Sequence, residues 1–225
     1  MLERLVRVAG QNAVPTTRST GSLALPVNFI HVGSDRMVTA LLLIDFQIDF
    51  LSDNGRMPVG EENANRIIST ANRLIDIHKE RHWPIIVIYN QFKKSDVIGN
   101  FFRKHAAVEE SAGGRLDPRL YVDDAPLFPK SSGSAFTNPN LSGYLRENSI
   151  GHVVICGVYA EGCVRATALD AQRANLRTTL ISDGVASNRK FKYKWALSHM
   201  QKRRIQVVSL HDYLESSNTP HEPLR

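Results

Sequence analysis

Continuous runs of apolar residues recur along the chain, with segments of helical spacing between them. The runs lie at 38–45 (VTALLLID), 84–90 (PIIVIYN), 152–158 (HVVICGV), 177–184 (RTTLISDG) and 204–210 (RIQVVSL), and a shorter one ends at Lys130. Unbroken apolar runs of this length are typical of parallel strands that are buried on both faces. The pattern therefore predicts six strands, most or all of them parallel.

Helical spacing is clearest in residues 61–82. The positions that fall on one side of this helix are Ala64, Ile67, Ile68, Ala71, Leu74, Ile75 and His78. Further helices are predicted over 162–175 and 191–203, whereas 91–125 lacks periodicity and predicts short helices and loops. This alternation predicts a doubly wound α/β fold, in which a mostly parallel six-stranded sheet lies between two layers of helices.

The carboxyl ends of the predicted strands carry polar side chains. Ligands of doubly wound sheets bind beyond these ends. Asp45, Asn90 and the turn YAEGC at 159–163 all fall there. We therefore expect them to converge in one crevice.

Length, charge and cysteine content narrow the class of protein. The 225 residues suit one domain, predicted at 37–212, with an arm or targeting segment at 1–36 and a tail at 213–225. Basic residues exceed acidic ones by six but form no run of five, so nucleic-acid binding is not expected. No apolar run approaches the roughly 20 residues that span a bilayer, so no membrane association is expected. Two cysteines seven residues apart fit neither a redox pair nor a zinc site, which favours a reducing, cytoplasmic location.

Cys163 lies where the strand predicted at 152–158 passes into the helix predicted at 162–175. Unpaired N–H groups and the positive end of the helix dipole favour a thiolate in such a first turn. Alternatively, Cys163 is a small buried core residue without a chemical role. Cys156, inside a predicted strand, is interpreted as such a core residue. A nucleophilic thiol needs a base and a charged partner, for which Asp45 and Lys130 are candidates. Taken alone, Asp45 is equally interpretable as a helix cap or a solvated group, and Lys130 is more readily interpreted as a surface lysine.

Three segments resemble the catalytic segments of the isochorismatase-like cysteine hydrolases: LLLIDFQIDF with Asp45, FPKSSGSAF with Lys130 and GVYAEGCVRATALDA with Cys163. LISDGVAS and ALSHMQKRRIQVV are similar to the last two strand and helix units of this family, so the resemblance covers 38–210. It implies that Asp45 takes the proton of Cys163 while Lys130 steadies the charged pair. It also implies a thioester intermediate, an oxyanion hole made by the backbone N–H groups of Tyr159 and Cys163, and a cis peptide before Tyr159.

The chain departs from the nicotinamidases of the same family after the second predicted strand. Where these carry an Asp-x-His metal motif, it reads YNQFKKSD, so we expect neither a metal nor another cofactor. The retained Cys163 favours hydrolysis of a C–N bond in a small amide or ureide. Two alternatives remain open: hydrolysis of a vinyl ether, as isochorismatases perform, and a catalytically inactive interaction module.

Side chains near these motifs are candidates for contact with a small-molecule substrate. They are Gln47, Phe50, Asn90, Phe92, Phe101, Arg103, Phe136 and Tyr159. The aromatic members are equally interpretable as core residues. Arg103 is expected either to bind a substrate carboxylate or to form a surface ion pair. The family resemblance implies a homodimer or homotetramer.

Overall fold

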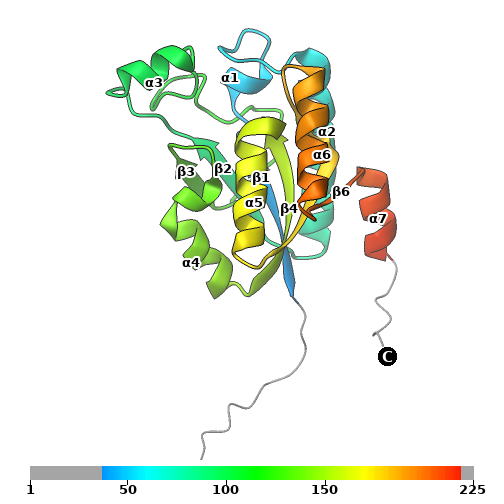
Figure 1. Cartoon of the computed structure of the whole chain (residues 1–225). Coiled ribbons are helices and arrows are strands. Elements are labelled where there is room, and N and C mark those ends of the chain that lie inside the picture. The colour runs from blue at the N-terminus through cyan, green and yellow to red at the C-terminus, as the bar shows by residue number, and fades with distance from the viewer. Residues whose placement is uncertain (1–36, 219–225) are drawn as a thin grey trace, which may run out of the picture. The chain divides into compact units, whose positions relative to one another are not determined.

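One six-stranded parallel sheet forms the centre of the fold in the computed structural model, which describes residues 37–218 (Figure 1). Its strands are β1 (Val38–Ile44), β2 (Ile85–Asn90), β3 (Leu127–Lys130), β4 (Ile150–Val158), β5 (Arg177–Ala186) and β6 (Gln206–Val208). They lie in the order β3-β2-β1-β4-β5-β6, and all neighbouring pairs are parallel. The predicted doubly wound α/β fold is confirmed.

Helices cover both faces of the sheet, because alternate residues of each strand point to opposite sides. In β1, Leu41 and Leu43 pack with α2 (Glu61–Glu80) and α7 (Leu210–Asn218). Leu42 and Ile44 pack with α4 (Pro139–Glu147), α5 (Arg165–Arg173) and α6 (Lys190–Lys202). The face predicted for α2 is buried along its length.

Short elements follow the strand ends at the carboxyl edge of the sheet. Helix α1 (Ile48–Leu51) comes soon after β1, and α3 (Val97–Phe102) lies in the loop section that follows β2. Figure 1 shows both beyond the same end of the sheet. This is the edge at which the sequence predicted the functional crevice.

Gly157 marks the closest approach of β4 to β1. Its φ is +138°, and a Cβ atom at this position would lie 2.0 Å from the carbonyl oxygen of Ile44. Only glycine fits such a backbone conformation and such a contact. The end of β4 is therefore held directly against the end of β1, which Asp45 follows.

The last described element is a helix that continues past the predicted end of the domain. Helix α7 spans Leu210–Asn218 and buries Tyr213, whereas the sequence placed the boundary after residue 212. The segments 1–36 and 219–225 lie outside the described residues. Between residues 37 and 218, no helix is long and apolar enough to cross a membrane.

Candidate active site

Lys130 joins the ends of two strands that are not neighbours. It is the last residue of β3, whereas Asp45 directly follows β1, and β2 lies between these strands. Two strand spacings amount to roughly 9 to 10 Å, a gap that the long lysine side chain can bridge. Its Nζ atom lies 2.9 Å from Oδ2 of Asp45, and both side chains are buried, with exposed fractions of 0% and 1%.

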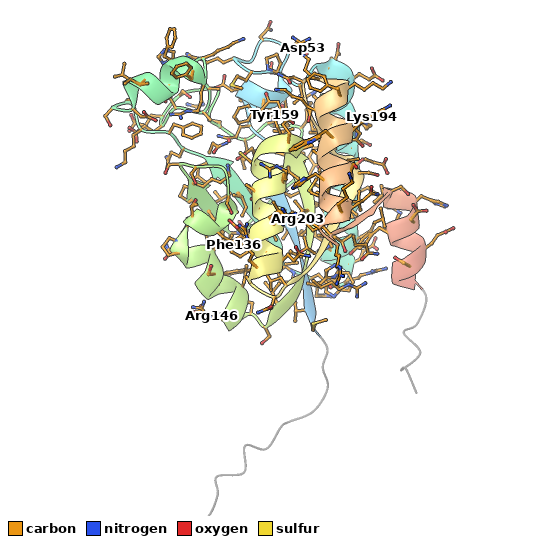
Figure 2. All side chains as sticks on the ribbon, in the orientation of Figure 1. Asp53, Phe136, Arg146, Tyr159, Lys194 and Arg203 are labelled. Atoms are coloured by element: carbon orange, nitrogen blue, oxygen red, sulfur yellow. The ribbon has the colours of Figure 1, made fainter. Side chains whose placement is uncertain are left out.

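Cys163 lies in an irregular turn between β4 and α5. The peptide between Val158 and Tyr159 is cis, as the family resemblance implied. A π-helical turn, η2 (Ala160–Val164), follows and is interrupted at Gly162, which has φ −106° and ψ −110°. Cys163 therefore precedes α5. The sequence had predicted it in the first turn of this helix, and that prediction is wrong. Figure 2 shows Tyr159 at the start of this turn, beside the amino end of α5.

The three residues of the predicted triad meet at the ammonium group of Lys130. Besides its contact with Asp45, Nζ lies 3.3 Å from Sγ of Cys163 and 3.3 Å from the carbonyl oxygen of Ser132. Cys163 is a partly exposed residue, whereas Asp45 and Lys130 are buried. The arrangement places the thiol of a partly exposed residue against a buried ion pair.

Burial controls the ionisation of this cluster. It raises the pKa of Cys163 to about 12, with the negative charge of Asp45 acting in the same direction and Lys130 opposing it. Burial likewise raises the pKa of Asp45 above its ordinary value, and Lys130 again opposes the shift. Burial lowers the pKa of Lys130, but the charges of Asp45 and Cys163 outweigh this and leave it raised. At neutral pH the resting thiol therefore keeps its proton.

Proton transfer from the thiol to Asp45 leaves the net charge of the cluster unchanged. Before transfer the cluster holds an ammonium, a carboxylate and a neutral thiol; afterwards it holds an ammonium, a carboxylic acid and a thiolate. Each state has one positive and one negative charge, so no additional charge is buried by the transfer. The geometry thus favours a thiolate that forms during reaction over one that is present at rest.

Alkylation should distinguish the two cysteines. We expect iodoacetamide to modify Cys163 and to leave Cys156 unmodified in the folded protein, because Cys156 is fully buried within β4 and its thiol pKa is raised by burial. The rate at Cys163 should keep rising from pH 7 to pH 10, since its pKa is about 12. Peptide mass spectrometry after timed quenching measures both rates. Equal labelling of the two sites would contradict the exposure described here.

Contacts that the sequence did not reveal hold the turn around Cys163. The Tyr159 hydroxyl donates to the carbonyl oxygen of Met57, and its ring meets that of Phe50 edge to face at 5.8 Å. The Glu161 carboxylate accepts a hydrogen bond from the Ser187 hydroxyl and lies 3.5 Å from the ammonium of Lys192. The two hydrogen-bond partners lie 26 and 102 residues from the residues that they contact, so spacing along the chain gave no signal for them.

Gln47 and Asn90 form a buried pair beside the triad. Gln47 donates to the carbonyl oxygen of Asn90 at 2.8 Å and accepts from the backbone N–H of Asn90 at 2.9 Å. It also donates to the carbonyl oxygen of Gly114 at 2.7 Å. Gln47 thus supports the backbone at the end of β2, and its expected contact with substrate stays a prediction.

The other candidates for substrate contact lie in two kinds of environment. Phe92 is buried beneath the guanidinium of Arg103, 3.9 Å from its ring centre, and Arg103 is paired with Asp96. Phe101, in α3, is 71% exposed. Phe136, labelled in Figure 2, is half-buried and packs against the core cluster to which α4 contributes Leu141 and Leu145. The structure brings none of these four side chains into hydrogen-bonding contact with the triad, and their role stays a prediction.

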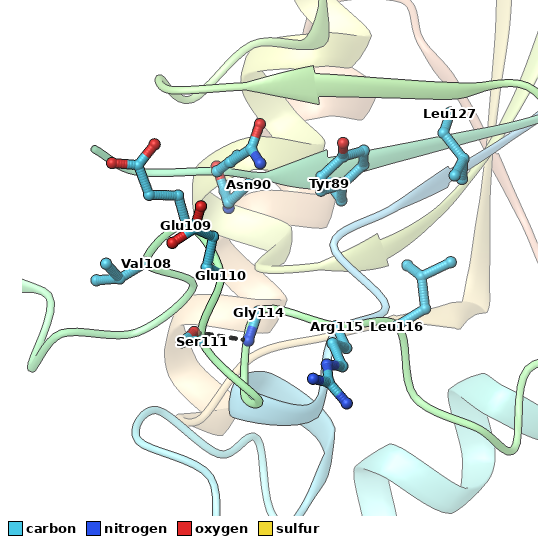
Figure 3. A pocket seen from close by; sticks show the side chains of 11 residues that line it. Tyr89, Asn90, Val108, Glu109, Glu110, Ser111, Gly114, Arg115, Leu116 and Leu127 are labelled. Carbon is cyan, nitrogen blue, oxygen red and sulfur yellow. Dashed lines mark hydrogen bonds between the residues drawn. The ribbon is translucent and has the colours of Figure 1, made fainter. Parts of the chain in front are cut away.

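A hollow of about 390 Å³ borders the end of β2 (Figure 3). Tyr89 and Asn90 line it on the strand side, and Ser111, Gly114 and Arg115 line it on the loop side. Gly114 N donates to Ser111 Oγ at 3.0 Å, which fixes the loop. Asn90 is the residue that this hollow shares with the surroundings of the triad.

Metal-ligating side chains do not cluster in the described part of the chain. Within 37–218, no group of three or more His, Cys, Asp or Glu residues is arranged to hold a metal ion. The position of the nicotinamidase motif holds Asn90, Gln91 and Phe92, as the sequence indicated. Of these, Asn90 contacts the triad lysine.

Comparison with known proteins agrees with this fold. Residues 39–212 match the model of the isochorismatase domain. A nicotinamidase of Escherichia coli is 28% identical over 178 residues, covering 64% of this chain and 81% of the relative. A protein of Arabidopsis thaliana described as a probable inactive nicotinamidase is 23% identical over 188 residues, covering 79% and 95%. The crystal structure of an isochorismatase-like hydrolase from Alkaliphilus metalliredigens superposes with a TM-score of 0.74 at 26% identity, covering 80% of this chain and all of that one.

The parallel α/β fold and the domain match define the class of protein as a hydrolase. The chain belongs to the isochorismatase family, as the three sequence segments had indicated.

Proposed function

We propose that this enzyme hydrolyses a C–N bond of a small amide or ureide, with Cys163 as the nucleophile. The observation that carries the proposal is the position of the Lys130 ammonium, 2.9 Å from Asp45 and 3.3 Å from the sulfur. A thiol and a base that both contact one fixed cation are the parts that nucleophilic catalysis by cysteine requires. The amide-cleaving activity named for the Escherichia coli relative supports the choice of bond.

The reaction would begin when Asp45 takes the thiol proton and the sulfur attacks the substrate carbonyl carbon. The oxyanion of the tetrahedral intermediate would face the backbone N–H groups of Tyr159 and Cys163. Collapse breaks the C–N bond, and Asp45 returns its proton to the departing nitrogen. The products of this half-reaction are ammonia or an amine and a thioester on Cys163.

Water completes the cycle by hydrolysing the thioester. Asp45 takes a proton from the attacking water, the C–S bond breaks, and the sulfur recovers the proton as the acid is released. Lys130 keeps its proton throughout, since its pKa is raised by the two neighbouring acids despite burial. Its charge balances whichever of Asp45 and Cys163 is negative.

A panel of small amides and ureides, assayed for released ammonia, tests the proposal. We expect Cys163→Ala to lower kcat/KM by about 10⁴-fold or more. Cys156→Ala is the matched control, because it removes the other thiol from within β4 and should retain hydrolysis. Ammonia release that survives in Cys163→Ala would exclude the mechanism.

Two other outcomes would assign a different function. Release of pyruvate from isochorismate without ammonia from any amide would identify a vinyl-ether hydrolase. Absence of turnover with either class, together with Cys163 no more reactive than Cys156, would identify a catalytically inactive member. The Arabidopsis relative described as probably inactive makes this last control necessary.

A further inference from the structure

We infer that Asn90 is a fourth member of the reacting cluster, which orients Lys130 and donates a hydrogen bond to the sulfur of Cys163. This inference rests on the proposed function, because it concerns how the thiolate is stabilised. It changes the role expected of Asn90 from contact with substrate to support of the nucleophile.

The parallel pairing of β2 with β3 places Asn90 directly opposite Lys130. The lysine side chain crosses the end of β2 on its way to Asp45, so the last residue of β2 lies beneath it. Oδ1 of Asn90 accepts a hydrogen bond from Nζ at 2.6 Å. An ammonium group can only donate, which fixes the amide with its oxygen toward Lys130.

The other end of the same amide faces the nucleophile. Nδ2 of Asn90 lies 3.9 Å from Sγ of Cys163, a long hydrogen-bonding distance for sulfur. A donor at this position interacts more strongly with a thiolate than with a thiol, since a negative sulfur is the better acceptor. Asn90 therefore favours the state in which the proton has moved to Asp45.

The backbone of Asn90 is fixed independently of this role. Gln47 makes one hydrogen bond to the N–H and another to the carbonyl of Asn90. A substitution at residue 90 can therefore change the side chain while these two backbone hydrogen bonds remain. Asn90 is 4% exposed, so little of it is available to a substrate. The Asn90 amide contacts a reacting group with its oxygen and another with its nitrogen. These contacts favour a role in the reaction over a purely structural role at the end of the strand.

An amide suits this position better than a carboxylate. Asn90→Asp would place a second carboxylate on the Lys130 ammonium and would leave the cluster with an excess negative charge. It would also remove the donor that faces the sulfur. Both changes oppose formation of a thiolate, so the pKa of Cys163 should rise further.

Two variants and a charge-matched control test the inference. Asn90→Asp adds a charge and removes the donor but keeps an oxygen at the Lys130 ammonium, whereas Asn90→Ala removes both the donor and the oxygen that accepts from Lys130. Asn140→Asp, at an exposed position of α4, makes the same change of charge away from the cluster. The rate of iodoacetamide modification at Cys163 is measured from pH 7 to 10, together with kcat and KM for the best amide and with thermal unfolding.

We expect Asn90→Asp and Asn90→Ala to slow alkylation at pH 8 by about 10- to 100-fold and to lower kcat by a similar factor, with KM nearly unchanged. The alkylation profile of Asn90→Asp should move to higher pH, and Asn140→Asp should stay within about twofold of the wild type. Unchanged alkylation, or a rise in KM alone, would overturn the inference and return Asn90 to substrate contact.

The alkylation rate needs no substrate and therefore separates this inference from the proposed function. Slower alkylation in both Asn90 variants supports the inference even if no amide is hydrolysed. If amide hydrolysis depends on Cys163 while the Asn90 variants alkylate and turn over normally, the proposed function stands and this inference fails.

Discussion

Replacing Lys130 with methionine should abolish hydrolysis and lower the free energy of unfolding by about 3 kcal/mol at neutral pH. The substitution keeps the length of the side chain but leaves Asp45 as a buried carboxylate without its cation. Removing one partner of a buried ion pair costs far more than the pair contributes, because the remaining charge stays desolvated. Urea unfolding at pH 7.5 and the ammonia assay measure the two effects.

The sign of the pH dependence makes this prediction specific. Burial already raises the pKa of Asp45, and loss of Lys130 removes the main influence that lowers it. A carboxyl group whose pKa is raised on folding destabilises the protein above its unfolded pKa, and this penalty shrinks as the group is protonated. The difference between Lys130→Met and wild type should therefore decrease from pH 7.5 to pH 5.5.

Two controls accompany the Lys130 variant. Lys194→Met removes an exposed lysine of α6 and should leave activity and stability unchanged (Figure 2). The double variant Asp45→Asn, Lys130→Met should recover part of the lost stability while remaining inactive, because both charges are gone. Full activity in Lys130→Met would exclude the role assigned to the ammonium.

Two buried histidines should make the free energy of unfolding decrease as the pH falls. His78 is fully buried in α2 against the Trp83 ring, and His152 in β4 is hydrogen-bonded by the hydroxyls of Thr39 and Thr179. Burial lowers the pKa of each to about 4, from an ordinary value of 6.5. Both imidazoles are thus neutral in the folded protein at pH 6 and take up protons on unfolding.

The stability contributed by neutral His78 and His152 is complete above pH 6.5 and is lost as the pH falls toward 4. Two protons taken up on unfolding give a slope of about 2 to 3 kcal/mol per pH unit within this window. Urea unfolding between pH 4.5 and pH 7.5 measures the slope. His78→Leu should reduce it by about half, whereas His211→Gln, at an exposed position, should not. A flat profile would contradict the burial of both rings.

The fold could be read from the sequence because its strands are apolar along their whole length. The apolar run ending at Asp45 and the helical face from Ala64 to His78 both appear as predicted. The segments bearing Asp45, Lys130 and Cys163 were recognised because together they resemble the catalytic segments of the isochorismatase-like cysteine hydrolases. Parallel topology brings such strand ends together at one edge of the sheet.

Other parts of the site depend on three-dimensional relations that the sequence does not contain. The link between Asn90 and Lys130 follows from the position of β2 between β1 and β3, which no local pattern indicates. The high pKa of Cys163 results from burial, whereas the sequence suggested only the thiolate-favouring start of a helix. Arg103 and Phe101 lie in the section 91–125, which lacks periodicity. Without a periodic pattern, the sequence does not indicate the direction of their side chains.

Strand β3 gives the site a dependence on local order. It is four residues long and, among the strands of residues 37–218, lies at the edge of the sheet and pairs only with β2, yet it supplies the lysine that holds the cluster together. Short edge strands with one neighbour open at a smaller free-energy cost than central strands do. Local opening of β3 would separate the Lys130 ammonium from Cys163 while the rest of the sheet stayed folded. The enzyme should therefore lose activity before it unfolds globally.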